Sequence, residues 1–341
     1  MSKHTKIYLI VFALIAVVIF FVSTKKQMEY STHIFDAMDT SIDITLITDK
    51  DGKKVVGEIS DIIYKYDKVF SHTDSEGEIY ELNQTKHEKL SNDTYSIIQE
   101  CEKFYHDTNG KFDITTGMLS DIWNESFNSG ILPEEELIKT KALDVGYNSL
   151  EFNDSENSVK ITKDNQKINL GALAKGYTAD KIKEIIDKNK IKSALINLGG
   201  NIYVKGKNKN GDIWNIGIKD PVGEDEVIMT LKLTDKFVIT SGNYIRYADI
   251  ESVRYHHIID AATGYPVQNE LNSVTIISDN GLLGDALSTS CFLVGFEESK
   301  KLLEKYNVSA VFATKDNKVY YSKALEKSIT KSSENYEYIP F

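Results

Sequence analysis

The segment "SVTIISDNGLLGDALSTSCFLVG", residues 273–295, carries two secondary-structure signals in one run. The first part, "SVTIISDN", is rich in β-branched residues and predicts a strand. The second part, "GLLGDALSTSCFLVG", is mostly apolar and predicts a buried helix at 281–295. A buried carboxylate is unfavourable unless it is paired, protonated or bound to a metal. Asp285 in this helix therefore needs a partner.

Two interpretations of Asp285 are open at this point. On a helix, Asp285 and Thr289 are four residues apart and point to the same side. A carboxylate and a hydroxyl are hard oxygen ligands of the kind that Mg²⁺ binds. Alternatively, Asp285 caps the helix after Gly284. A cap explains the carboxylate but leaves the hydroxyls at 288–290 without a role.

The rest of the chain mixes strands and helices. Residues 38–46 alternate apolar and polar side chains and predict a half-buried strand. Residues 54–70 and 92–108 have the helical period, with a polar loop at 71–83 between them. The stretch 193–206 predicts two strands joined at Gly-Gly-Asn, and the last strands are expected near 308–322. Because there is no strict strand–helix–strand alternation, we expect an α+β fold.

Composition narrows the class of protein. The 341 residues are 41% hydrophobic and 27% charged, as in an ordinary globular protein. The net charge is −11 without a basic block in the folded part, which argues against nucleic acid as a partner. Cys101 and Cys291 both lie in apolar surroundings, so we expect two buried free thiols, with a disulfide as the alternative.

The N-terminus predicts a membrane anchor. Residues 7–24 are uncharged and would rise about 27 Å as a helix, close to the roughly 30 Å of a hydrocarbon core. We favour an uncleaved single-pass anchor over a cleaved signal peptide, because no small-residue cleavage site follows the apolar run. Residues 1–6 would be a cytoplasmic stub and 25–32 a juxtamembrane linker. The domain that follows, from about residue 30 onward, is then expected outside the cytoplasm, attached to the cell membrane.

Four stretches have polar residues that could carry chemistry. In "NLGALAKGY", 169–177, small residues and Lys175 at a helix start favour an anion, although a plain strand-to-helix turn is the alternative. In "KFDITTGMLSDIW", 111–123, Asp113 and Thr115 suit hydrogen bonds to a ligand or a capped turn. "VITSGNYIRY", 238–247, ends a strand at Ser241-Gly242, a common place for binding groups. In "HHIIDAATGYPV", 256–267, His257 suits a general base or a structural histidine.

These stretches, taken in order, resemble the ApbE family of FAD:protein FMN transferases. The resemblance runs over about 34–295 and implies one large mixed-sheet catalytic domain at 33–323, followed by a polar tail at 324–341. The matching segments are "MDTSIDITL", "DSEGEIYELN", "FDITTGMLSDIW", "INLGALAKGYTAD", "INLGGNIYVKG", "IGIKDP", "ITSGNY", "HHIIDAATGYP" and "SVTIISDNGLLGDALSTSCFLVG".

The resemblance also implies an activity and a set of site residues. Such an enzyme binds FAD and Mg²⁺, transfers FMN to a Thr or Ser hydroxyl of a partner protein and releases AMP; the partners are exported or membrane redox proteins. The implied metal ligands are the Ala172 carbonyl, Asp285 and Thr289, with Lys175 beside them. Independently of the resemblance, we nominate His257 as the candidate base. The implied FAD contacts are Met38, Thr73, Asp113, Ile114, Thr115, Asn169, Lys175, Ser241, Gly242 and Ile258.

Three positions depart from the family pattern. Asp39 stands where the family has glycine, Thr73 where it often has an aromatic residue, and Asn169 where it usually has aspartate. A missing aromatic residue would change FAD affinity and the exclusion of water. Two alternatives therefore stay open, namely an FAD pyrophosphatase that gives FMN and AMP, and an anchored flavin-binding protein without turnover.

Overall fold

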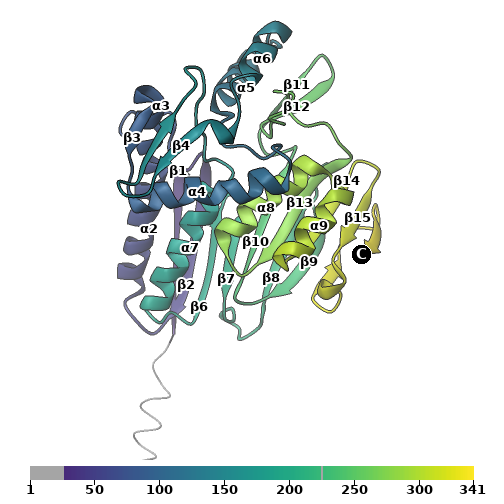
Figure 1. Cartoon of the computed structure of the whole chain (residues 1–341). Coiled ribbons are helices and arrows are strands. Elements are labelled where there is room, and N and C mark those ends of the chain that lie inside the picture. The colour runs from purple at the N-terminus through teal and green to yellow at the C-terminus, as the bar shows by residue number, and fades with distance from the viewer. Residues whose placement is uncertain (1–26, 224–225) are drawn as a thin grey trace, which may run out of the picture.

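The computed structural model describes residues 27–223 and 226–341, and its centre is one nine-stranded sheet (Figure 1). The strand order is β1-β2-β6-β7-β10-β13-β14-β15-β17. Neighbours run antiparallel except β15 and β17, which run parallel, so the sheet is mixed. The strands are β1 Met28–Ala37, β2 Thr40–Thr48, β6 Ser193–Leu198, β7 Asn201–Lys205, β10 Lys236–Gly242, β13 Leu271–Ser278, β14 Ser309–Thr314, β15 Lys318–Tyr321 and β17 Glu337–Pro340.

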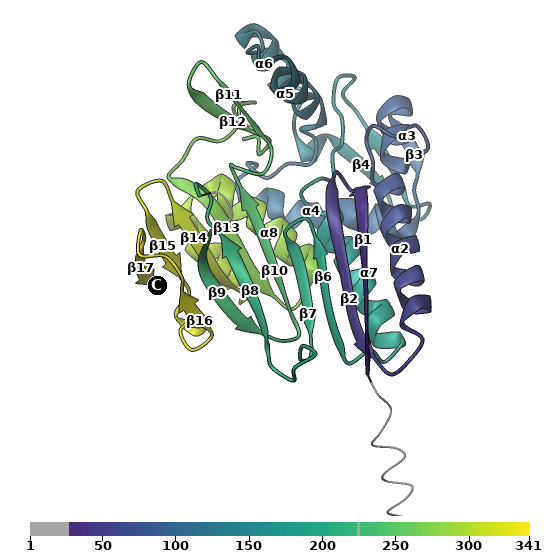
Figure 2. The same ribbon diagram turned by 180° about the vertical axis from the view of Figure 1, so that it is seen from behind.

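Helices cover one face of this sheet, and a second, smaller sheet covers the other (Figures 1 and 2). The helices on that face are α2 Gly52–Val69, α4 Asn92–Asp107, α7 Ala174–Lys188, α8 Gly281–Val294 and α9 Phe296–Tyr306. The others are α3 Glu78–Thr85, α5 Gly117–Ser129 and α6 Glu135–Ala142, of which α5 and α6 lie beyond one end of the sheet (Figure 1). The small sheets are β16 Ile329–Lys331 with β9 Val227–Leu233 and β8 Trp214–Lys219, then β3 His87–Lys89 with β5 Ser158–Ile161 and β4 Leu150–Asn153, and the hairpin β11 Tyr247–Ile250 with β12 Val253–His256.

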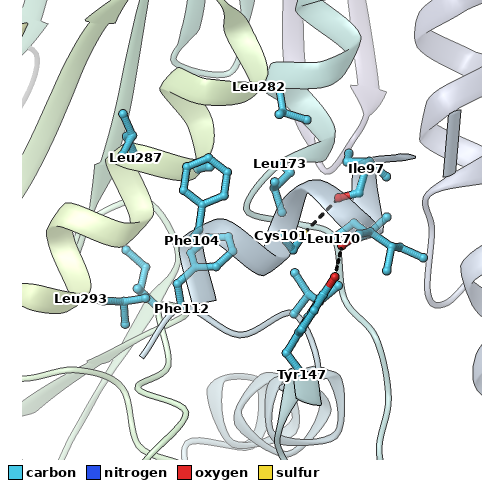
Figure 3. Packing of buried hydrophobic residues seen from close by; sticks show 14 of the residues in the cluster. Ile97, Cys101, Phe104, Phe112, Tyr147, Leu170, Leu173, Leu282, Leu287 and Leu293 are labelled. Carbon is cyan, nitrogen blue, oxygen red and sulfur yellow. Dashed lines mark hydrogen bonds between the residues drawn. The ribbon is translucent and has the colours of Figure 1, made fainter. Parts of the chain in front are cut away.

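Strand β13 is buried at every position, because α8 lies on one side of it and the β8–β9 layer on the other. Its run of β-branched residues therefore has no polar face, unlike the alternating β2. On the helical side, apolar side chains from α4, α8 and the loops before α5 and α7 form a continuous core around Cys101 and Phe104 (Figure 3). The Cys101 thiol donates to the Ile97 carbonyl at 3.1 Å and forms no disulfide.

Much of the expected architecture is confirmed. The domain is α+β with a large mixed sheet, and residues 193–205 form the expected hairpin across Gly199-Gly200. Both cysteines are buried free thiols. The strand expected at 38–46 lies two residues later, because Met38 and Asp39 form the turn that precedes it.

Three boundaries were wrong. Part of the expected linker at 25–32 belongs to strand β1, which pairs along its length with β2. Part of the loop at 71–83 is helix α3. The expected polar tail at 324–341 is integral to the domain, since β17 adds a strand to the main sheet, and buried Tyr336 donates to Asp220 at 2.6 Å. Strands β1 and β17 were not predicted because their segments contain many polar residues, and a strand needs only one apolar face.

The described part of the chain contains no helix that is long and apolar enough to cross a membrane. The anchor predicted at 7–24 lies outside the described residues.

Candidate functional site

A cavity of about 400 Å³ opens where the turn between β1 and β2, the loops before α5 and α7, the end of β10 and one side of α8 meet. Most of the residues predicted for the site lie in its wall. They are Met38, Thr73, Asp113, Ile114, Asn169, Ala172, Lys175, Ser241, His257, Ile258, Asp285 and Thr289. Two predicted contacts, Thr115 and Gly242, do not reach it; both are buried behind the wall.

Helices α7 and α8 cross at two glycines beside this cavity. A Cβ atom on Gly176 would lie 2.4 Å from the Gly281 carbonyl oxygen, and a Cβ on Gly281 would lie 2.4 Å from the Gly176 carbonyl oxygen. No real side chain tolerates such a distance, so both positions need glycine for the close approach of the two backbones. At this crossing the first turn of α7 packs directly against the first turn of α8.

Each of these helices is capped by a carboxylate from the other. Asp180 on α7 accepts from the backbone N–H groups of Gly281 and Leu282 at 2.7 and 2.8 Å. Asp285 on α8 accepts from the Gly176 N–H at 2.8 Å. Negative charge is stabilised at a helix N-terminus, where backbone donors are unpaired. The interpretation of Asp285 as the cap of its own helix is wrong, because α8 begins at Gly281 and Asn280 is its cap.

This exchange of partners frees a carbonyl oxygen. In a regular helix the Gly176 N–H would donate to the carbonyl four residues earlier, which is that of Ala172. Because Gly176 donates to Asp285 instead, no backbone donor in the described residues bonds the Ala172 carbonyl. Ala172, with this free carbonyl, and Asp285 both line the same cavity.

The hydroxyl cluster on α8 leaves a lone pair on Thr289 in a similar way. The Ser288 hydroxyl donates to the Asp285 carbonyl at 2.9 Å, so it accepts from Ser241 at 2.8 Å. Ser241 has only one proton, and its 3.2 Å contact with Thr289 must be donated by Thr289. The Thr289 oxygen therefore keeps its lone pairs for a ligand in the cavity.

The three oxygens match the donors that a hard cation requires. Burial raises the pKa of the Asp285 carboxyl above its ordinary value, and the Lys175 ammonium opposes that rise. A cation would stabilise the same charge more strongly. The described residues hold no cluster of three or more His, Cys, Asp or Glu side chains suited to a metal. An ion here would rest on one carboxylate and neutral oxygens, a pattern typical of Mg²⁺ that also binds substrate phosphates.

His257 is held by the chain in one tautomer. Its backbone N–H and its Nδ1 both lie within 3.2 Å of the Arg246 carbonyl oxygen, so Nδ1 carries the proton and Nε2 is unprotonated. Burial and, to a smaller extent, the charge of Arg246 together lower the pKa of His257 to about 3. The neighbouring His256 differs, because Nε2 bonds the Val267 carbonyl and Nδ1 accepts from the Ile258 N–H.

Other predicted residues shape the loops. Asp113 accepts from the N–H and hydroxyl of Thr115 and from the Tyr147 N–H, so its carboxylate folds the turn before α5. Thr115 completes that turn by accepting from the Gly146 N–H at 2.9 Å. Asn169 accepts from the Gly171 N–H through Oδ1, which an aspartate would do equally. Asparagine in place of aspartate at position 169 therefore preserves the loop conformation but removes one negative charge from the cavity wall.

Two groups of cavity residues escaped sequence reasoning. Arg246 lines the mouth and pairs with Asp39 of the β1–β2 turn at 3.2 Å. Trp123 and Phe127, one helical turn apart on α5, supply an aromatic wall. The spacing of Trp123 and Phe127 could have signalled an apolar face, but nothing in the sequence brings Asp39 to Arg246.

Comparison with known proteins places this geometry in a family. The model of the ApbE family matches residues 38–312. An FAD:protein FMN transferase of Treponema pallidum is 32% identical over 241 residues, 66% of each chain. One from Klebsiella pneumoniae is 28% identical over 79% of this chain and 84% of its own. The crystal structure of the ApbE protein from Thermotoga maritima superposes with a TM-score of 0.81 at 29% identity, covering 88% of this chain and 99% of that one. This chain belongs to the ApbE family.

Proposed function

We propose that this protein transfers FMN from FAD to a hydroxyl group of an acceptor protein and releases AMP. The observation that carries the proposal is the cavity wall in which the Ala172 carbonyl, Asp285 and Thr289 present oxygens beside Lys175. The family supplies the reaction, since the relatives above are named FAD:protein FMN transferases. The acceptor residue we propose is Thr or Ser.

Mg²⁺ is the cation that we propose for this wall, held by the Ala172 carbonyl, Asp285 and Thr289. When bound, it would neutralise phosphate charge and act as a Lewis acid. The chain itself supplies a second positive charge, Lys175, which makes no hydrogen bond or ion pair with any described residue. The ammonium group is therefore available to bind the diphosphate of FAD.

The transfer exchanges one phosphorus–oxygen bond for another. The acceptor hydroxyl oxygen bonds to the phosphorus of the FMN half, and the bond from that phosphorus to the oxygen shared with AMP breaks. AMP leaves with the electron pair. We propose that His257 Nε2 takes the hydroxyl proton, because the Arg246 carbonyl fixes the proton on Nδ1 and leaves Nε2 with a lone pair.

The location of the protein in the cell is also part of the proposal. We propose that residues 7–24 anchor the domain in the cell membrane and that the domain works outside the cytoplasm on an exported or membrane redox protein. The uncharged run between lysines supports the anchor.

The test uses the full-length chain, FAD and MgCl₂ with a protein extract from cells that lack the gene. A protein band that keeps flavin fluorescence after denaturation supports the proposal, and mass spectrometry of that band locates the modified residue. FMN and AMP formed without such a band would show a pyrophosphatase instead. FAD that stays intact would show a binding protein without turnover. Both of these outcomes contradict the proposal.

A further inference from the structure

The turn between β1 and β2 is unusual for residues with side chains. Met38 and Asp39 connect the paired residues Ala37 and Thr40, and their φ angles are 54° and 57°. A two-residue turn with both φ angles positive favours glycine and asparagine, and a methionine there is strained. The turn is held from outside, since the Met38 N–H donates to Asp67 at 2.7 Å. It thereby places Asp39 on the cavity wall.

At that position Asp39 meets the cation at the cavity mouth. Its Oδ2 lies 3.2 Å from Arg246 Nη2, and the same nitrogen lies 3.5 Å from the Asp39 carbonyl oxygen. The carboxylate is 80% exposed and the guanidinium 43% exposed. A pair this exposed contributes little to stability and can exchange partners with a dissolved anion.

Arg246 lies near the place where a diphosphate would bind. The backbone N–H of His257 donates to the Arg246 carbonyl at 3.1 Å, and the charges of Arg246 and Lys175 both act on the His257 imidazole. All three residues line the cavity. An anion that enters between Lys175 and Arg246 can pair with both, but only after Asp39 gives up the guanidinium.

We infer that Asp39 is an internal competitor for Arg246, and that this carboxylate weakens the binding of the FAD diphosphate. This inference rests on the proposed function, because it names how the same cavity tunes its affinity for its substrate. Arg246 pairs with Asp39 in the free protein and with a phosphate of FAD in the complex.

The experiment measures FAD binding to the full-length protein by flavin fluorescence, in chelator and without acceptor, so that no turnover occurs. Asp39→Asn keeps the shape and tolerates the positive φ. We expect it to lower the Kd for FAD about three- to fivefold, which is the range of an exposed ion pair. Asp49→Asn, a matched change just beyond the other end of β2, should leave the Kd unchanged.

Two comparisons decide whether the effect passes through Arg246 and the phosphates. In an Arg246→Gln background, Asp39→Asn should no longer change the Kd for FAD, and riboflavin, which has no phosphate, should bind equally to all variants. An unchanged Kd in Asp39→Asn, an effect that persists without Arg246, or an equal effect on riboflavin overturns the inference. Because binding is read without turnover, a protein that binds FAD but transfers no FMN still tests it.

Discussion

Asp180 and Asp285 perform the same structural task at the two ends of one helix crossing, yet their surroundings differ. Asp180 uses both carboxylate oxygens on the backbone N–H groups of α8. Asp285 uses Oδ2 on Gly176 and also lines the cavity. Burial raises the pKa of both carboxyls. The difference teaches that a helix cap becomes a candidate ligand when the capping residue also lines a cavity.

The two adjacent histidines repeat this contrast. His256 has partners on both ring nitrogens and is buried, whereas His257 has a partner on Nδ1 and faces the cavity. In each pair, one residue is satisfied within the fold and the other keeps a polar atom for a ligand.

The sharpest test of the comparison is Asp285→Asn. An amide oxygen can still accept from the Gly176 N–H, so we expect the melting temperature to stay within a few degrees of wild type. The loss of negative charge should lower kcat/KM for FMN transfer by about a hundredfold or more. Flavin fluorescence on denaturing gels gives the rate, and thermal unfolding gives the stability. Wild-type activity in this variant would remove Asp285 from the proposed cation site.

Asp180→Ala should show the opposite pattern. It leaves two N–H groups at the start of α8 without their charged acceptor, and we expect the free energy of unfolding to fall by about 2–3 kcal/mol. Activity per folded molecule should stay near wild type. Asp187→Ala on the same helix is the control, because its ion pair with Lys205 is exposed and should matter little. A selective loss of activity in Asp180→Ala would show that the two carboxylates are not divided as described.

Gly281→Ala tests the crossing that both caps depend on. Its Cβ would lie 2.4 Å from the Gly176 carbonyl, so the helices must move apart. We expect a loss of about 1–3 kcal/mol in unfolding free energy, together with reduced activity. Gly57→Ala on α2 is the control, since a Cβ there meets nothing within 4 Å and should be neutral or stabilising. Equal stability of the two variants would show that the close approach is not needed.

The smallest expected effect concerns pH and His257. Because burial lowers the pKa of His257 to about 3, the folded protein resists its protonation. The stability from this group is present above the unfolded value of about 6.5 and is lost as the pH falls from there toward 3. His257→Gln should therefore flatten the decline in unfolding free energy between pH 7.5 and 5.5 by about 1 kcal/mol. Denaturant unfolding at both pH values measures this difference. If the unfolding free energies of wild type and His257→Gln fall equally between the two pH values, His257 does not have the lowered pKa.

Sequence patterns predicted the elements with a clear apolar period, such as α2, α4 and the hairpin at 193–205. They missed β17, because an edge strand of only four residues has little periodicity. For the site, helical spacing indicated that Asp285 and Thr289 share a side. It could not show the Asp180–Asp285 exchange or the Asp39–Arg246 pair, since both depend on how distant segments pack.

The most direct test of the account is the intact mass of acceptor protein after incubation with FAD and MgCl₂. The acceptor is the flavin-labelled protein isolated from the extract described above, prepared again from cells that lack the gene. With wild-type enzyme we predict a mass increase of one FMN less one water on a Thr or Ser residue. Asp180→Ala at equal folded concentration should give the same increase, and Asp285→Asn almost none. An unmodified acceptor with wild-type enzyme, or full modification by Asp285→Asn, would contradict the account.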